Sequence, residues 1–428
     1  MKEFAEHPLI MKSAKGVWYE DVAGKKYLDG LSGIFVVNVG HGNRRVIDAM
    51  KKQLEEITFA PPLYSTNLRA IELAELLSKI TPGDLHSVKI LNSGSEATET
   101  AMKLARQYHK QSGNPHKYKV ISLYGGFHGV TMGALSASGT TKRKVAFEPF
   151  GAGYVHVFPP TCYRCPYGLT YPDCHILCAT IVEDVIKRED PSTVAALIVE
   201  PISNTLGIIT PPDEYFKILR EICDRYNVLL IFDEIITGFG RTGEMFAAQT
   251  FGTTPDIMCM GKGMASGYSP IAGIAFRDKI AEAFYGRSED QVQFNDGHTY
   301  GGNPLSCAAA IATINFILDE KLHYKAREQG ARIVKELKEL DLSIIGEIRG
   351  KGLLIGVEFV KDKKTKAQFD DRVNFGVRVG RNAMQKGLII RFDPHWCAFA
   401  PPLIIENEEV DKMVQIFHES VKQALAAA

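Results

Sequence analysis

The 428-residue chain has no excess charge of either sign, because 50 Lys and Arg residues balance 50 Asp and Glu residues. This balance argues against broad electrostatic capture of nucleic acid or of an acidic membrane surface. The chain also lacks any apolar run near the ~20 residues that cross a bilayer, and residues 1–7 lack the apolar stretch of a secretory signal. We therefore expect a cytoplasmic protein that binds neither nucleic acid nor a membrane.

Cysteine is scarce, with 8 residues, and free thiols or metal ligands are expected rather than a disulfide framework. Four cysteines form a C-x2-C-x8-C-x3-C pattern in a stretch rich in Pro, Tyr and Gly: Cys162, Cys165, Cys174 and Cys178. Four such thiols could hold a structural zinc ion, but the inner gap is shorter than the ~15–20 residues of zinc ribbons. We favour a loop of reduced cysteines, or one disulfide, over a metal site.

The sequence does contain short β-branched runs that alternate with helical periodicity, the pattern of a mostly parallel sheet covered by helices. The expected strands are Val88–Leu91, Val120–Leu123, Ala195–Val199, Val228–Phe232, Ile257–Met260 and Ile271–Phe276. Apolar residues at helical spacing predict helices over Ala97–Tyr108 and Asp213–Tyr226, the second preceded by Pro211-Pro212.

The pattern changes near residue 325, where charged helical segments begin to alternate with short strands. We expect helices at Lys325–Leu340, Asp371–Lys386 and Glu408–Leu425, and strands at Leu353–Phe359 and Leu388–Ile390. The sequence therefore predicts an α/β chain in three parts. Residues 1–60 join a small domain, residues 61–325 form a large domain, and residues 326–428 form the small α+β domain.

Polar motifs follow three of the expected strands. One motif, Ser93-Gly94-Ser95-Glu96-Ala97, lies at the start of an expected helix. Free N–H groups and the helix dipole bind anions at such a point. Ser followed by Glu also fits a helix cap, which is the alternative interpretation. Asp233 ends an apolar strand, at the sheet edge where ligands bind in open α/β sheets, but it also fits an N-cap or a salt bridge. Lys262 stands between two glycines after the next strand, and a lysine held neutral can form a Schiff base.

With these motifs in this order, the sequence resembles the class III aminotransferases, which use pyridoxal 5'-phosphate (PLP), over essentially the whole chain. The motifs shared with the family are Leu31–Phe35, Asn38–Gly42, Asn92–Ala97, Gly126–Gly129, Val199–Pro201, Phe232–Ile235, Gly238–Gly243, Gly261–Gly263, His298–Pro304 and Ala400–Leu403. The resemblance implies the type I fold of PLP-dependent transferases, with a mostly parallel seven-stranded sheet in the large domain. It also implies a homodimer or tetramer whose sites lie at the dimer interface.

The resemblance implies a role for each matching residue. The residues that would bind the cofactor are Gly94, Ser95, Phe127, His128, Glu200, Asp233, Ile235, Lys262 and Thr299. Among them, Lys262 would hold PLP covalently and shuttle a proton at the substrate carbon, and Asp233 would keep the pyridinium nitrogen protonated. Thr299 would reach the phosphate bound by a neighbouring subunit. Phe127 stands where many relatives carry Tyr, so that it would stack on the ring without a hydroxyl contact.

A dinucleotide fingerprint, G-x-G-x-x-G, also occurs over Gly238–Gly243. A true fingerprint begins at a strand end and opens a helix. This one starts five residues beyond Asp233, and the segment that follows it is interrupted by Gly252. We therefore expect no dinucleotide site at this position.

Arg391 follows the expected strand Leu388–Ile390, ten residues before Pro401-Pro402. That placement resembles the mobile arginine of ω-amino-acid:pyruvate transaminases, which binds the α-carboxylate of pyruvate or alanine and swings aside for other amines. A planar guanidinium suits this role because it pairs with a carboxylate bidentately; the alternative is a surface Arg at a strand end. With Phe127, Phe35 and Trp396 would line a partly apolar pocket for amines such as β-alanine, 4-aminobutyrate, taurine or a diamine.

We therefore predict transamination between a small-molecule amine and a keto acid, with pyruvate as the acceptor. A 2-oxoglutarate-dependent relative, of the 4-aminobutyrate or acetylornithine type, would share every cofactor residue. An aminomutase or decarboxylase on the same fold is a further alternative. A non-enzymatic binding protein is disfavoured because Lys262 and Asp233 are both present.

Overall fold

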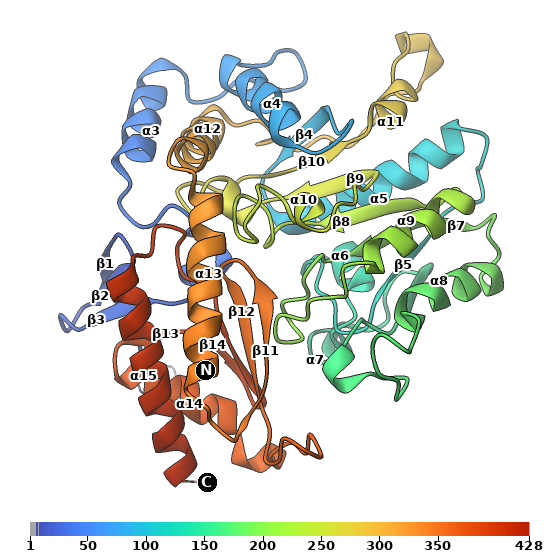
Figure 1. Cartoon of the computed structure of the whole chain (residues 1–428). Coiled ribbons are helices and arrows are strands. Elements are labelled where there is room, and N and C mark those ends of the chain that lie inside the picture. Colours follow the sequence, from blue (N-terminus) through green and yellow to red (C-terminus); the bar gives the residue numbers. More distant parts are fainter. Residues whose placement is uncertain (1–5, 7, 428) are drawn as a thin grey trace.

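The computed structural model of the chain describes residue 6 and residues 8–427, so that residues 1–5 and 7 of the expected N-terminal segment, and residue 428, lie outside it. A seven-stranded sheet forms the centre of the large domain, in the order β4-β10-β9-β8-β7-β5-β6 (Figure 1). Its strands are β4 (Ser87–Leu91), β5 (Lys119–Leu123), β6 (Tyr154–Val157), β7 (Val194–Val199), β8 (Leu229–Asp233), β9 (Ile257–Met260) and β10 (Ala272–Phe276).

The seven-stranded sheet is mostly parallel, as predicted, with β10 as the exception. β10 runs antiparallel to both of its neighbours, β4 and β9, whereas the other adjacent pairs are parallel. Because β4 and β9 both oppose β10, they point the same way. The carboxyl ends of β4, β5, β7, β8 and β9 therefore meet at one edge of the sheet, which is where ligands bind in open α/β sheets.

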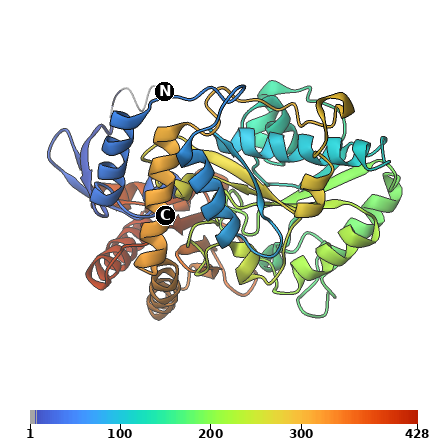
Figure 2. The same ribbon diagram turned by 90° about the horizontal axis from the view of Figure 1, so that it is seen from above.

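Helices cover both faces of this sheet, because successive side chains of a strand point to opposite faces. In β8, Leu229 and Ile231 pack in the cluster that contains α5 (Gly94–Gln111), and Leu230 and Phe232 pack in the cluster on the other face. Figure 2 shows α5 running alongside the sheet. The other helices between β3 (Lys26–Asp29) and residue 320, apart from the short α2 (Ser32–Phe35), are α3 (Arg44–Glu56), α4 (Leu68–Ile80), α6 (Met132–Ala137), α7 (Thr141–Lys144), α8 (Leu177–Arg188), α9 (Tyr215–Arg225), α10 (Ala247–Thr250), α11 (Asp278–Glu282) and α12 (Pro304–Asp319).

The C-terminal part of the chain packs its helices against an antiparallel sheet of order β11-β12-β15-β14. Its elements are α13 (Leu322–Glu339), β11 (Ile345–Lys351), β12 (Leu354–Phe359), α14 (Phe375–Gln385), β13 (Leu388–Ile389), β14 (Arg391–Asp393), β15 (Trp396–Phe399) and α15 (Asn407–Ala426). Two differences from the expected elements stand out here. Arg391 opens a further strand, β14, which was not expected after Leu388–Ile390, and the expected helix Asp371–Lys386 is broken.

The break in that helix lies at Asn374, which has the left-handed φ of 49°. It separates a 3-10 turn, η5 (Asp371–Val373), from α14. The side chain of Asp370 accepts a hydrogen bond from the Arg372 N–H at 2.9 Å. Such a local bond gives the backbone an alternative to the helix, so that the helix begins only at Phe375.

The N-terminal strands lie beside the C-terminal part of the chain, as the dark blue and red segments of Figure 1 show. They are β1 (Met11–Lys15), β2 (Trp18–Asp21) and β3 (Lys26–Asp29), and the short helix α2 (Ser32–Phe35) follows them. β3 pairs in parallel with β13, with Leu28 opposite Leu388.

The proposed boundaries near residues 60 and 325 remain predictions. In the described part of the chain, no helix has both the length and the apolar character needed to cross a bilayer.

Candidate active site

A cavity of about 200 Å³ lies at the carboxyl edge of the seven-stranded sheet. Its walls come from the segments that follow β4, β5, β7, β8 and β9. All the predicted cofactor-binding residues except Thr299 line it: Gly94, Ser95, Phe127, His128, Glu200, Asp233, Ile235 and Lys262. Thr299 is exposed and lines a separate surface groove.

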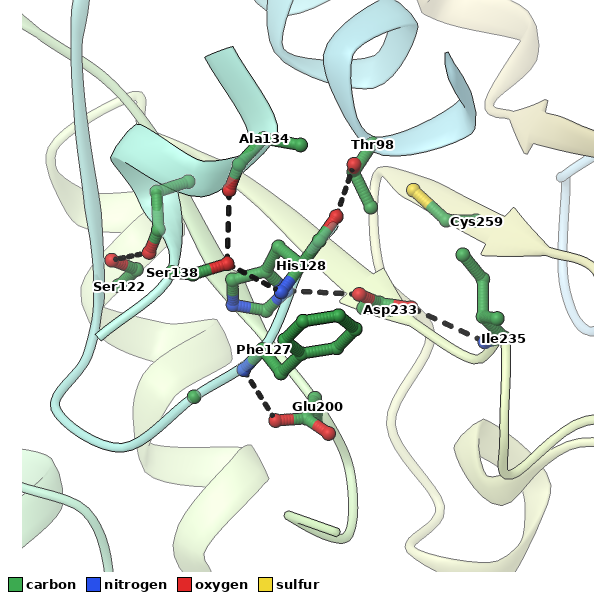
Figure 3. A network of polar contacts seen from close by, with 12 residues as sticks. Thr98, Ser122, Phe127, His128, Ala134, Ser138, Glu200, Asp233, Ile235 and Cys259 are labelled. Carbon is green, nitrogen blue, oxygen red and sulfur yellow. Dashed lines mark hydrogen bonds and ion pairs between the residues drawn. The ribbon is translucent and has the colours of Figure 1, made fainter. Parts of the chain in front are cut away.

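The base of the cavity holds a buried carboxylate that is oriented by a histidine (Figure 3). Asp233 ends β8, and its Oδ2 lies 2.9 Å from Nδ1 of His128. Its Oδ1 accepts the N–H of Ile235 at 3.2 Å. His128 is itself fixed, since Thr98 Oγ1 donates to its carbonyl at 2.6 Å and its N–H donates to Ser138 Oγ at 2.8 Å. The carboxylate is therefore held in one orientation, in the same cavity that Lys262 lines.

Glu200 follows β7 and forms another part of the wall. Its Oε1 accepts the N–H of Phe127 at 3.0 Å, and its Oε2 accepts the N–H of Asn204 at 3.3 Å. Burial raises the pKa of Glu200 to about 7, against the opposing effect of the nearby His128. Glu200 thus fixes the backbone beneath the Phe127 ring, as Figure 3 shows.

Lys262 follows β9 and has a left-handed φ of 42°. This conformation is costly for a residue with a side chain, and strain of this kind occurs often at functional sites. Burial lowers the pKa of Lys262, although the charges of Asp233 and Glu200 oppose the shift. The environment therefore moves the side chain toward the neutral amine, the form that attacks a carbonyl.

The N-terminus of α5 forms the anion-binding end of the cavity. Ser93 is the helix cap, since its Oγ accepts the Glu96 N–H at 3.3 Å. The capping interpretation is therefore right for Ser93, and it leaves the N–H groups of Gly94 and Ser95 without an intrahelical acceptor. A Cβ on Gly94 would lie 2.7 Å from Cδ1 of Ile235, so that glycine keeps this end open. Helix N-termini of this kind bind phosphate.

Two neighbouring residues were missed by the sequence analysis. Val130 donates its N–H to Ser95 Oγ at 3.0 Å and orients that hydroxyl. Gly129 has φ 138°, and a Cβ there would lie 2.5 Å from Ser95 Oγ. The signal was a glycine directly after His128, which marks a close approach of the backbone to another element.

The cavity residues fit PLP in their chemistry. Free helix N–H groups and a hydroxyl suit the phosphate, and the buried carboxylate suits a protonated ring nitrogen. Phe127 and Ile235 offer apolar surfaces to the ring, and the lysine with a lowered pKa suits the aldehyde. Nε2 of His128 is buried without a hydrogen-bond partner among the described residues, so that a polar group remains available on the side away from Asp233.

None of the three predicted substrate residues, Phe35, Arg391 and Trp396, lines this cavity. Trp396 is buried in β15 and lines a neighbouring groove of about 460 Å³. Arg391 lies over it, with Cζ 5.3 Å from the Trp396 ring, and its positive charge contributes to lowering the pKa of Lys262. Phe35 is buried in the core and does not line the cavity.

The four-cysteine segment borders the groove that Trp396 lines, since Thr161, Arg164 and Pro166 are in its wall. Cys162, Cys165, Cys174 and Cys178 line one small cavity of about 20 Å³, and all four are free thiols. Among the residues the structure describes, no group of three or more His, Cys, Asp or Glu side chains is arranged to hold a metal ion. The segment also contacts the small domain through an ion pair between Arg164 and Glu358.

The dinucleotide-like segment Gly238–Gly243 forms turns between β8 and α10. Arg241 within it is fully buried, and its guanidinium donates to Asn38 Oδ1 at 2.6 Å and to Ser32 Oγ at 2.9 Å. This segment therefore connects the turns after β8 to Ser32 and Asn38 of the N-terminal segment.

Comparison with known proteins gives matches over nearly the whole chain. The family model described as "Aminotransferase class-III" matches residues 2–421. A putrescine–pyruvate aminotransferase of Pseudomonas aeruginosa is 34% identical, covering 98% of this chain and 91% of its own. An (S)-enantioselective omega-transaminase from Thermomicrobium roseum has a TM-score of 0.94 at 36% identity, covering 99% of this chain and 94% of its own. A PLP-bound amine transaminase from an uncultivated Pseudomonas species has a TM-score of 0.92 at 32% identity, covering 100% and 96%.

Proposed function

Because this chain belongs to the class III aminotransferases, which are PLP-dependent enzymes, we propose that it transfers the amino group of an ω-amino acid or amine to pyruvate. The observation that carries the choice of acceptor is Arg391. Its Nε is buried without a hydrogen-bond partner among the described residues, and it lies close enough to Lys262 to affect its pKa. A guanidinium without a carboxylate partner in the described part of the chain, electrostatically coupled to the reacting lysine, suits the α-carboxylate of a small keto acid. The putrescine–pyruvate relative supports the same acceptor.

Each residue of the cavity has a separate role in this reaction. PLP, when bound, supplies the electron sink that stabilises negative charge on the substrate carbon. Gly94 and Ser95 bind the phosphate and fix its position. Asp233, oriented by His128, holds the proton at the ring nitrogen. Lys262 Nζ holds the cofactor and then moves the proton at the amine-bearing carbon.

Arg391 in this scheme binds the carboxylate of pyruvate and orients its carbonyl toward Lys262. The Trp396 ring beneath the guanidinium supports it by a cation–π contact. An amine that lacks an α-carboxylate gains nothing from this contact. The two half-reactions therefore depend on Arg391 to different extents.

Replacement of Arg391 tests the proposal. A charged hydrogen bond of this kind contributes roughly 1.5–3 kcal/mol, or about 10–150-fold. Arg391→Ala should therefore slow the half-reaction with pyruvate at least tenfold. The half-reaction with an arylalkylamine that has no carboxylate should change little, and single-turnover spectroscopy of the holoenzyme measures the two separately.

The same preparation separates the proposed acceptor from 2-oxoglutarate. A matrix of donors and acceptors with wild-type holoenzyme should show higher kcat/KM with pyruvate. Preference for 2-oxoglutarate, or equal losses in both half-reactions of Arg391→Ala, would contradict the proposal. Amine rearrangement or decarboxylation without consumption of a keto acid would indicate the aminomutase or decarboxylase alternative.

We further propose that a second copy of the chain completes the site. A surface groove of about 840 Å³ has Thr299 and the apolar side chains of Phe59 and Leu63 in its walls. Leu63 is 83% exposed and the adjacent Tyr64 is 89% exposed, and patches of this kind mark interfaces. Thr299 would lie at the partner's phosphate, as the resemblance implies. Light scattering should give the mass of a dimer or tetramer, and a monomer mass would contradict this assignment.

A reducing compartment, the cytoplasm, is the proposed location. All eight cysteines of the chain are free thiols, and thiols persist where glutathione and thioredoxin keep them reduced. Thiol titration of protein denatured under anaerobic conditions should find all eight. Loss of a pair of thiols to a disulfide in cells would contradict the proposal.

A further inference from the structure

One cationic side chain beside the cavity has no part in the scheme above. Arg143 lies on the short helix α7, and its Cζ is 4.9 Å from the centroid of the Phe127 ring. Phe127 lines the cavity that holds Lys262. The guanidinium of Arg143 has no hydrogen bond or ion pair in the part of the chain that the structure describes, and its side chain is exposed. It is therefore free to bind a ligand that enters above Phe127.

Arg143 also lies close to Arg391. Burial lowers the pKa of Arg391, and the positive charge of Arg143 is the next largest cause, ahead of the opposing effects of Asp393 and Glu200. Two neighbouring guanidinium groups repel each other unless an anion lies between or beside them. Since neither has a carboxylate within ion-pair distance among the described residues, their donors can both serve a bound oxyanion.

We propose that Arg143 is a second anion-binding residue of the substrate site, and that the amino donors are acidic: amines with a carboxylate or sulfonate at the end opposite the amino group. The inference rests on the proposed transamination. Arg391 binds the carboxylate next to the reacting carbonyl of the acceptor. Arg143 binds the distal acid of the donor, which lies farther from Lys262.

A different role for Arg143 would be to hold Phe127 in place. A cation–π contact contributes about 0.5–1 kcal/mol at an exposed site, and its loss would affect every substrate alike because Phe127 faces the cofactor position. Anion binding affects only substrates with a distal acid. The two roles therefore differ in their substrate dependence.

The test compares two donors of equal length on the holoenzyme, with pyruvate as the acceptor. 4-Aminobutyrate carries the distal carboxylate, and 4-aminobutanamide carries a neutral amide in its place. Arg143→Met should raise the KM for 4-aminobutyrate about tenfold or more and leave the KM for 4-aminobutanamide near the wild-type value. Arg143→Lys, which keeps the charge without the planar fork, should give an intermediate KM.

Lys142→Met is the matched control. Lys142 is an exposed neighbour on the same helix, so that its replacement removes the same charge without removing the group above Phe127. It should leave both KM values near wild type. An equal loss of 4-aminobutyrate affinity in Lys142→Met would show a general charge effect and would overturn the assignment. Equal losses for both donors in Arg143→Met, or no loss for either, would overturn it as well.

Binding without turnover separates this inference from the proposed reaction. 4-Hydroxybutyrate has the distal carboxylate but no amine, and calorimetric titration of the holoenzyme measures its Kd directly. Arg143→Met should weaken this Kd about tenfold, and Lys142→Met should not. An unchanged Kd in Arg143→Met would overturn the role of Arg143 even if pyruvate is confirmed as acceptor. A tenfold loss in an enzyme that does not use pyruvate would support Arg143 while contradicting the proposed acceptor.

Discussion

At the scale of single residues, the site depends on side chains that are fixed before any ligand enters. Asp233 is 5% exposed and His128 is 2% exposed, and each has its orientation set by hydrogen bonds to the large domain. A carboxylate fixed in this way does not have to reorient as charge develops on the substrate. Preorganised charge of this kind is usually a large contribution to catalysis.

Asp233→Asn tests that contribution. The amide keeps the shape of the side chain but cannot stabilise a protonated ring nitrogen, so that kcat should fall by about two orders of magnitude or more. PLP should still bind, as its absorption spectrum would show. Glu244→Gln is a control, because Glu244 is paired with Arg327 and does not line the cavity. It should retain near wild-type kcat, and an unchanged kcat in Asp233→Asn would exclude the electronic role.

Lys262→Ala tests the covalent attachment of the cofactor. Turnover should be lost, and borohydride treatment should no longer fix PLP to the protein, because no other lysine lines the cavity in the described part of the chain. Mass spectrometry of the digested protein measures the attachment. Lys279→Ala, which replaces a lysine paired with Asp256 instead, should keep both properties. Activity near wild type in Lys262→Ala would remove the central element of the proposed function.

At the scale of elements, the sequence predicted every strand of the seven-stranded sheet except β6, and it missed β11, β14 and β15 of the C-terminal part. All six residues of β7 are buried, and its continuous apolar run therefore predicted a strand. β6 lies at the sheet edge with only Val157 buried, and its Tyr154-Val155-His156-Val157 pattern gave too weak a signal. β14 and β15 are joined around Asp393 and Pro394, and their pairing depends on tertiary contacts that local pattern does not encode.

For the site as well, the sequence predicted the residues that follow strongly apolar strands and missed exposed residues elsewhere. Motifs at the ends of buried strands predicted the residues around Asp233 and Lys262. Arg143 was not predicted, because an exposed basic residue on a four-residue helix looks like any solvated surface charge. Its position over Phe127 follows only from the way the segment after β5 folds back toward the cavity.

The contact between α5 and β7 gives a prediction for pH. His109, fully buried near the end of α5, has Nε2 2.9 Å from the Ala195 carbonyl. Burial lowers its pKa to about 4. A histidine with a depressed native pKa stabilises the fold fully above its unfolded pKa near 6.5, and the stability falls as pH drops from about 6.5 to 4. From pH 7 to pH 5 this loss is about 2 kcal/mol.

His109→Gln should remove that loss, because glutamine does not titrate. Urea unfolding of the variant and of wild type at pH 7 and pH 5 measures the difference in free energy of unfolding. His116→Gln, at an exposed position of the following loop, should keep the wild-type pH dependence. The same pH dependence in His109→Gln as in wild type would assign the acid sensitivity to other groups.

At the scale of the whole molecule, Arg241 joins segments from three parts of the chain. Its guanidinium donates to Asn38 Oδ1 in the N-terminal segment, and to the carbonyls of Leu353 and Pro401 in the C-terminal part. Burial lowers its pKa to about 9. A charge is placed in the interior here because several buried acceptors need a donor at one point.

Arg241→Met should leave those acceptors unpaired. Each buried acceptor without a donor costs about 1–3 kcal/mol, so that the free energy of unfolding should fall by at least that amount in chemical denaturation. Arg327→Met is the control, since Arg327 is a largely exposed neighbour paired with Glu244, and surface pairs contribute about 0–1 kcal/mol. Equal, small effects in the two variants would show that Arg241 does not hold the segments together.

The pairing of β3 with β13 has a consequence for the order in which the chain folds during synthesis. Leu28 and Leu388 are partners in the sheet, and the Ala400 N–H donates to the Gly30 carbonyl at 2.8 Å. The first strands leave the ribosome early, yet their partner strand is among the last segments made. The seven-stranded sheet, complete once β10 has emerged, can form while the chain is still growing. β3 can pair with β13 only after nearly the whole chain has been made, and long-range pairing of this kind is slow. We therefore expect this pairing to be completed after synthesis ends.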